Sequence, residues 1–284
     1  MDKRLINLSK SIDFSLDLMK KLEERKNLTV EQKIILSIYR KLIEQIDGNF
    51  VLADHQLKSP SIVMIRSALE TYLSLKYITQ HKRFIKDRAI SYYVGYIINQ
   101  KIVYNNMLEN PPKHVSMPEE EFKNKIVKID QLLKSPIFKK ILNQWKFTKE
   151  IQNKKFNYTY EPKWYSLFKG PTSIKMLVSR LNDEQIYKYY EILSLEAHGY
   201  ESLNGLNNDD IINKPFSFKP IRDTENSSHF AGMARALCTS ATHEIIKNMS
   251  PELNGEFIKF MNELGLIGKY QNELKIRLNQ IKMV

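Results

Sequence analysis

Apolar residues recur every three or four positions along most of the chain, which is the spacing of amphipathic helices. The pattern predicts helices over residues 3–25, 29–56, 61–79, 87–108, 117–133, 136–144, 171–181, 183–203 and 252–264, and one that ends near residue 248 and is capped by Asp223 or Ser227. No stretch alternates apolar and polar residues over the length of a strand, and no internal repeat is found. We therefore expect an all-α protein, built as an antiparallel helical bundle.

Proline and glycine mark the breaks between these helices. The clearest break is the triplet Asn110-Pro111-Pro112, and the aromatic and basic stretch 145–169 shows no regular helical pattern. We expect a single all-α domain over residues 1–284, with a partly irregular insertion at 109–170.

Composition narrows the class of partner. The chain has 284 residues, of which 42% are hydrophobic, so it is long enough to bury a sizeable core. It carries 44 Lys and Arg against 32 Asp and Glu, a formal net charge of +12, which favours anionic partners and nucleic acid above all. The alternative is that the excess is solvated surface charge of a chain rich in Lys, Asn and Ile.

The N-terminal stretch, the apolar runs and the cysteine content of the sequence indicate where in the cell the protein is expected. The N-terminal stretch reads as an amphipathic helix interrupted by charges, which differs from a signal peptide. No run approaches the roughly 18 apolar residues that a membrane span needs. A single cysteine, Cys238, cannot form an intrachain disulfide or a cysteine-based zinc site. We expect a cytoplasmic protein without a membrane segment.

Common catalytic and metal motifs do not occur in the sequence. None of the residues three positions before the six histidines is acidic, as a di-iron site in a helical bundle would require. The chain has no H-E-x-x-H zinc motif, no G-x-x-x-x-G-K phosphate loop and no G-x-S-x-G nucleophile elbow. We therefore expect neither a bound metal nor an organic cofactor.

Two of the predicted helices carry polar residues in or beside an apolar face. On the helix 61–79, Arg66 lies within the apolar stripe and Glu70 follows one turn later. On the helix 183–203, Ser194 and His198 follow the edge of the apolar face. A buried charge without a partner is very costly, so we expect the two helices to pack together and form a polar pocket. The alternative is an ordinary helical ion pair and a histidine that bonds between helices.

The stretch 145–169 interleaves aromatic residues with lysines. Its candidates for contact with nucleic acid are Lys154, Lys155, Lys163 and Trp164, because rings stack on bases and lysines neutralise phosphates. The alternative, which the pattern favours, is a loop whose aromatic side chains fill the interior of the bundle.

Three short motifs together resemble a known family. Arg66-x-x-x-Glu70 in IRSALETYLSLKYI is followed by WYSL at 164–167 and by YYEILSLEAHG at 189–199. They resemble the DUF5677 family, uncharacterised bacterial helical proteins with a similar R-x-x-x-E helix and a later Y-x-x-L-S-x-x-x-H helix. The likeness covers residues 60–205. By a looser analogy the family is similar to HEPN-type helical proteins, many of which are ribonucleases or toxins in anti-phage and toxin–antitoxin systems.

A second candidate motif follows from the HEPN analogy. HEPN nucleases carry an arginine and a histidine with four to six residues between them, and Arg222 and His229, with six residues between them, fit that pattern. In such enzymes the arginine holds the scissile phosphate and the histidine moves a proton without a metal. The two side chains would share a face if the helix already covers Arg222. Pro220 and the pair Ser227-Ser228 instead favour a loop at Arg222.

The function expected from these resemblances is a toxin of abortive infection or anti-phage defence that cleaves RNA without a metal. Its catalytic residues would be Arg66, Glu70, Ser194 and His198, with Arg222 and His229 as the second set. The resemblance implies RNA, an antitoxin or defence partner protein, and a homodimer as partners. The alternative function is a non-catalytic helical module that binds nucleic acid or a partner protein.

Overall fold

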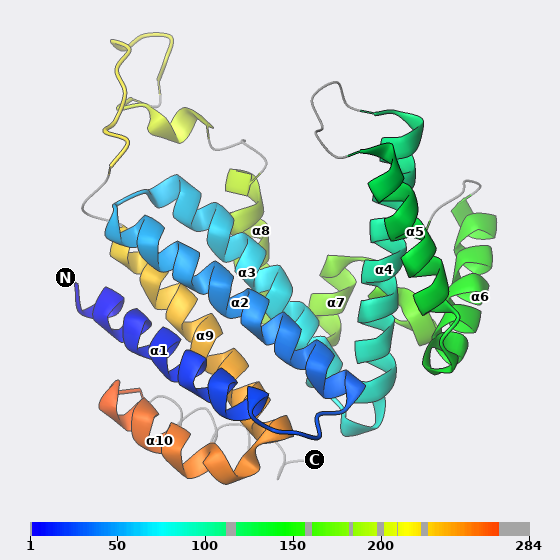
Figure 1. Ribbon diagram of the computed structural model, residues 1–284. Coiled ribbons are helices and arrows are strands. Elements are labelled where there is room, and N and C mark those ends of the chain that lie inside the picture. The colour runs from blue at the N-terminus through cyan, green and yellow to red at the C-terminus, as the bar shows by residue number, and fades with distance from the viewer. Residues whose placement is uncertain are drawn as a thin grey trace, which may run out of the picture. The chain divides into compact units, whose positions relative to one another are not determined.

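The fold is helical throughout the part of the chain that the structure describes. The computed structural model describes residues 2–111, 118–156, 161–181, 184–197, 202–208, 210–222 and 227–266. Within these ranges every regular element is a helix, and the single isolated bridge joins Leu206 and Phe218 (Figure 1). The predicted all-α class is confirmed.

The described residues contain ten α-helices and five short 3-10 helices. The α-helices are α1 (Lys3–Glu23), α2 (Val30–Asp54), α3 (Lys58–Thr79), α4 (Ile85–Glu109), α5 (Glu119–Leu133), α6 (Lys139–Phe156), α7 (Ile174–Arg180), α8 (Glu184–Ala197), α9 (Ser227–Met249) and α10 (Asn254–Glu263). The 3-10 helices are η1 (Lys82–Phe84), η2 (Pro136–Phe138), η3 (Trp164–Lys169), η4 (Ser202–Gly205) and η5 (Pro251–Leu253). No helix in the described ranges combines the length and the apolar character that crossing a membrane demands.

Local sequence explains where several helices begin. Before α2, the backbone N–H of Thr29 donates to the side chain of Gln32 at 2.9 Å, and the N–H of Gln32 donates back to the Thr29 hydroxyl at 3.4 Å. This reciprocal capping box satisfies two N–H groups that lack a helical partner. α3 begins at Lys58, earlier than predicted, because Pro60 needs no N–H partner in a first turn.

α6 differs most from its prediction. The sequence pattern ends this helix at residue 144, whereas α6 continues to Phe156. Its buried stripe runs through Ile141, Trp145 and Thr148, which recur at helical spacing. The lysines and aromatic residues between them lie on the outer face, and Phe147 is 54% exposed. These exposed aromatic residues hide the helical period of apolar residues in the sequence.

The described residues form two compact units. The first comprises the described parts of Met1–Lys26, Ile38–Tyr72 and Tyr190–Val284, and the second comprises those of Asn27–Ser37 and Leu73–Tyr189.

The first unit is held together by a polar cluster inside its apolar core. The Ser15 hydroxyl lies 3.3 Å from the sulfur of Cys238 and 3.0 Å from the Thr242 hydroxyl, which in turn lies 2.8 Å from the hydroxyl of Tyr39. These residues belong to α1, α2 and α9, so the cluster joins three helices. Ser15 and Tyr39 are fully buried, and the short contacts compensate for the water that their hydroxyls have lost.

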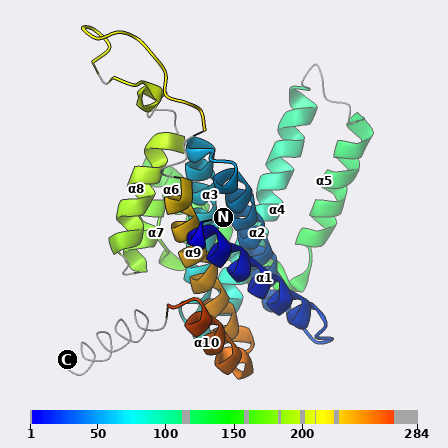
Figure 2. The same cartoon turned by 90° about the vertical axis from the view of Figure 1, so that its left-hand side faces the viewer.

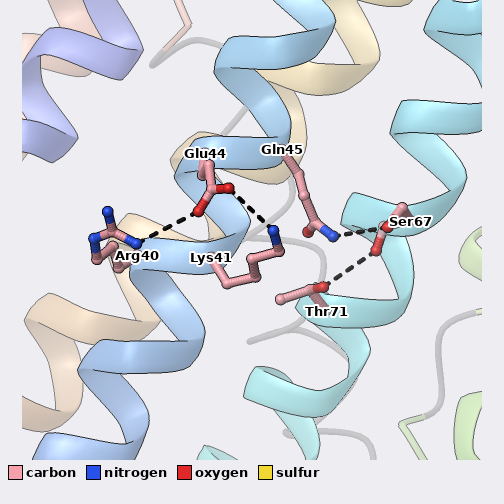
Figure 3. A network of polar contacts seen from close by, with 6 residues as sticks. All are labelled: Arg40, Lys41, Glu44, Gln45, Ser67 and Thr71. Atoms are coloured by element: carbon pink, nitrogen blue, oxygen red, sulfur yellow. Dashed lines mark hydrogen bonds and ion pairs between the residues drawn. The ribbon is translucent and has the colours of Figure 1, made fainter. Parts of the chain in front are cut away.

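The polar contacts between α2 and α3 set the position of α3 in the first unit. The Gln45 amide donates to the Ser67 hydroxyl at 2.7 Å (Figure 3). Further along, the Asn49 amide donates to the Ser61 carbonyl at 3.0 Å, and both residues are fully buried. These bonds fix the register of α3 along α2, and therefore the height at which its other side chains meet their neighbours.

The core of the second unit is built from α4, α6 and η3, and α5 runs antiparallel to α4 (Figure 2). Trp145 of α6 lies in this core and its indole N–H donates to Glu161 at 2.8 Å. Gly95 of α4 faces both tryptophans: a Cβ at this position would lie 2.9 Å from the Cβ of Trp164 and 3.5 Å from the ring of Trp145. Only a glycine lets α4 approach η3 this closely.

We expect Gly95→Ala to destabilise the protein by about 1–2 kcal/mol, because the overpacking cost exceeds the gain in helix propensity. Gly232→Ala is the matched control, since Gly232 also lies in a helix but an added Cβ would meet no atom within 4 Å. That change should stabilise by up to about 1 kcal/mol. Urea denaturation measures both, and equal stability changes for the two variants would contradict the close packing of α4.

The buried cluster of the first unit predicts a pH dependence. Burial raises the pKa of the Cys238 thiol to about 12, from an ordinary value near 9. The folded state therefore keeps this proton when the unfolded state releases it, so stability is unaffected below about pH 9 and falls above it, by up to about 1.4 kcal/mol per pH unit. Cys238→Ala should have a shallower loss between about pH 9 and 11 than the wild type. Identical slopes in urea titrations would contradict a buried, protonated thiol.

Candidate functional site

The candidate site is centred on the guanidinium of Arg66. Arg66 lies midway along α3 and is only 9% exposed, between the buried residues Ile65 and Leu69 of the same helix. A charge in such a position must be matched by hydrogen bonds and an opposite charge.

α8 and the next turn of α3 provide these partners. Nε of Arg66 donates to the Ser194 hydroxyl at 3.0 Å, and Nη1 forms an ion pair with Glu70 at 2.5 Å. The guanidinium carbon lies 3.7 Å from the centre of the Tyr190 ring, in a cation–π contact. The expected approach of the two helices is therefore found for Arg66, Glu70 and Ser194.

The hydroxyl of Ser194 has a defined orientation. Its oxygen lies 2.6 Å from the backbone carbonyl of Tyr190, one turn earlier in α8, and donates its proton there. The lone pairs then face Arg66 and accept the bond from Nε. Because its proton is engaged, Ser194 serves to position the guanidinium and is poorly placed to act as a nucleophile.

The ion pair with Glu70 is asymmetric in burial. The Arg66 side chain is 10% exposed and that of Glu70 is 46% exposed, so the carboxylate of Glu70 is open to solvent and the guanidinium of Arg66 is buried. Arg40 and Glu44 have the same spacing on α2, but their side chains are 69% and 54% exposed (Figure 3). An exposed pair of that kind contributes about 0.3–0.5 kcal/mol, whereas loss of Glu70 would leave the buried guanidinium of Arg66 without its ion-pair partner.

One donor of Arg66 stays available in this arrangement. Nε and Nη1 have the partners described above, and among the described residues Nη2 meets no hydrogen-bond acceptor. A guanidinium held by a ring, a hydroxyl and a carboxylate, with one edge unused, is suited to bind an anion such as phosphate.

Other predicted site residues are placed less closely or not at all. His198 lies outside the described residues, as α8 is described to Ala197. Arg222 is exposed and donates to the backbone carbonyl of His55 at 2.7 Å. Since α9 begins at Ser227, Arg222 precedes the helix that carries His229, and the condition for a shared helical face is not met.

The predicted nucleic-acid contacts divide into two kinds. Lys154 and Lys155 are exposed at the end of α6, and Lys163 is exposed just before η3. Trp164, by contrast, is packed edge-on against Tyr92 with 5.1 Å between ring centres and stands beside the core of the second unit. Its ring is engaged with other aromatic side chains, as expected for a residue that fills the interior.

Tyr190 was missed as a site residue by the sequence reasoning. The sequence pattern gives it no polar partner, although its position four residues before Ser194 gives both side chains the same direction. An aromatic residue at that spacing, opposite an arginine expected to be buried, is the signal that could have identified the cation–π contact. Among the described residues no three His, Cys, Asp or Glu side chains are grouped so that they could hold a metal ion.

The fold and the site define an all-α protein with a buried, multiply bonded arginine between two helices. The family model described as "Family of unknown function (DUF5677)" matches residues 32–214, more than half of the chain. The chain belongs to this family, as its R-x-x-x-E and Y-x-x-L-S motifs indicate. Comparison with curated proteins and with solved structures gave no match.

We expect Ser194→Ala to destabilise the protein by about 1–3 kcal/mol, because it leaves Nε of a buried arginine without an acceptor. Ser37→Ala is the matched control: Ser37 is an exposed helical serine whose hydroxyl also donates to the carbonyl four residues earlier. Its loss should be small, and the difference between the variants in urea denaturation isolates the bond to Arg66. Equal changes would show that the Arg66–Ser194 bond contributes nothing to stability.

Proposed function

We propose that the protein is a metal-independent ribonuclease of the toxin or anti-phage effector kind, in which Arg66 holds the scissile phosphate. The observation that carries this proposal is the geometry of Arg66: its guanidinium is oriented by Glu70, Ser194 and Tyr190, while Nη2 has no acceptor in the part of the chain that the structure describes. The formal net charge of +12 favours a polyanionic substrate.

The proposed chemistry needs a proton carrier beside the arginine. His198 follows Ser194 by four residues in the sequence, and the imidazole is the side chain best suited to acid–base work near neutral pH. The imidazole accepts the proton of the RNA 2′-hydroxyl, whose oxygen attacks the phosphorus. The bond between phosphorus and the 5′-oxygen then breaks, and that oxygen takes a proton from the imidazolium. Arg66 stabilises the charge that develops on the phosphate oxygens.

A second candidate function is a non-catalytic module that binds RNA or a partner protein. The Glu70 ion pair favours it, because a carboxylate 2.5 Å from Nη1 already balances the charge that would stabilise a transition state. In this case Arg66 would recognise an anionic group without promoting its cleavage. The exposed residues Lys154, Lys155 and Lys163 would then contribute phosphate contacts.

The biological setting and the partners are proposed from the HEPN analogy. In systems of that kind the helical protein forms a homodimer and is held inactive by an antitoxin or a defence partner protein. RNA is the proposed substrate, and DNA is not expected to be cut because it lacks the 2′-hydroxyl that attacks the phosphorus.

We expect the purified protein to cleave RNA in the presence of EDTA and to leave fragments that end in a cyclic phosphate, because an imidazole and a guanidinium perform the reaction. His198→Ala should lower the rate by about 10²-fold or more, and Arg66→Lys should lower it markedly because lysine lacks the planar fork. Arg40→Met, which removes an exposed arginine with the same spacing to a glutamate, is the control and should retain activity. Gel assays on labelled RNA measure each rate.

The outcomes separate the candidates. If His229→Ala abolishes cleavage and His198→Ala does not, Arg222 and His229 form the site. If no RNA is cut but RNA binds with an affinity that falls steeply with salt, the protein is a binding module. Cleavage that stops with EDTA and returns with a divalent ion would contradict the proposed mechanism. Circular dichroism of each variant shows whether a lost activity reflects a lost fold.

A further inference from the structure

A cavity in the second unit is not used by the proposed reaction. Its volume is about 160 Å³, and Tyr77, Phe84, Arg88, Trp164, Phe168 and Arg180 are among the residues that line it. A cavity needs roughly 10–15 Å³ of such volume to hold a single water, so this one has room for several. It is therefore larger than a site for a single ion.

Two arginines line this cavity, and in the described part of the chain neither is in an ion pair with a carboxylate. Asp87 also lines it, but its carboxylate pairs with Lys140 at 2.6 Å. Among the described residues no carboxylate forms an ion pair with Arg88 or Arg180. Burial, and in addition the positive charge of Arg180, lowers the pKa of the Arg88 guanidinium. An anion between the two side chains would relieve this unfavourable arrangement of like charges.

Backbone carbonyls hold both arginines in place. Nη1 of Arg88 donates to the carbonyl of Tyr77, and its guanidinium carbon lies 3.9 Å from the centre of the Tyr77 ring. Nη2 of Arg180 donates to the carbonyl of Lys169 at 2.9 Å. Gln80 links the two: its amide oxygen accepts from Arg88 at 3.5 Å and its amide nitrogen donates to the Arg180 carbonyl at 3.0 Å. The charges are thus pre-positioned for a ligand, which lowers the entropic cost of binding.

The wall beside Arg180 has an unusual backbone. Phe168 and Lys169 have φ angles of 56° and 59°, the left-handed region that non-glycine residues seldom adopt. Gly170 follows, where a Cβ would lie 1.9 Å from the Tyr165 carbonyl oxygen. This tight turn brings the Phe168 ring to the cavity and the Lys169 carbonyl to Arg180. Strain of this kind is found where a fold positions groups for a ligand.

We propose that this cavity binds a 5′-mononucleotide, with the phosphate between Arg88 and Arg180 and the base against the aromatic wall. Two guanidiniums match a phosphate monoester in charge, about −1.5 to −2 at neutral pH, better than they match a single carboxylate. The rings of Phe84 and Phe168 provide apolar surface for a flat heterocycle. The site lies wholly within the second unit, whereas Arg66 and its partners belong to the first.

Isothermal titration calorimetry of the full chain tests the proposal with AMP, UMP, ribose 5-phosphate, inorganic phosphate, citrate and adenosine. We expect one mononucleotide per chain, and affinities at least about tenfold lower for adenosine, which lacks the phosphate, and for inorganic phosphate, which lacks the base. Failure of AMP and UMP to bind at millimolar concentration would overturn the proposal. Equal binding of citrate would overturn the assignment of a phosphate, and equal binding of inorganic phosphate would overturn the assignment of a base.

Variants locate the binding site. Arg180→Met changes an exposed side chain that the fold can spare, and should weaken AMP binding at least about tenfold; Arg88→Lys should do the same while keeping a positive charge. Arg83→Met is the control, because Arg83 is exposed and stacks on Phe84 but does not line the cavity. Phe168→Gly suits the positive φ and removes the ring, and should reduce AMP affinity towards that of phosphate. Unchanged affinity in Arg180→Met and Arg88→Lys would overturn the proposal.

Discussion

The buried guanidinium of Arg66 imposes the strongest constraint on the first unit. A charge that is 9% exposed cannot be left unpaired, so α3 and α8 must meet where Ser194, Tyr190 and Glu70 can reach it. An apolar residue at this position would satisfy the core without such partners. The arginine therefore specifies which turn of α8 faces α3, and its Nη2 meets no acceptor within the described ranges.

The helices around this site are fixed by a second set of buried polar groups. Ser15, Tyr39, Cys238 and Thr242 exchange short contacts between α1, α2 and α9, and burial raises the pKa of both Cys238 and Tyr39. Each contact requires one register of the helices, because a shifted hydroxyl would be left without a partner in the core. The Gln45 and Asn49 amides fix the register of α3 along α2 in the same way, and this register sets the position of Arg66.

The arginines of this chain show how surroundings decide what a guanidinium can do. Arg40 is exposed and paired with Glu44, so its charge is largely screened by water. Arg66 has the same spacing to a glutamate, yet its burial makes the pair a structural requirement. Arg88 and Arg180 face a cavity with no described carboxylate as ion-pair partner. Only the last arrangement is left with an excess of positive charge, which is why we assign an anionic ligand to it.

The sequence by itself determined the all-α class, most helix positions and the need of Arg66 for a partner. These follow from local periodicity, from capping and from the cost of a buried charge. Each of these signals can be read from a short stretch of consecutive residues. The tertiary structure alone decided that α6 continues to Phe156, because the period there depends on Trp145 being buried and Phe147 being exposed. It also brought Arg88 and Arg180 to one cavity. These residues are distant in the sequence, and their approach depends on how α4, η3 and α7 pack, which no local sequence pattern specifies.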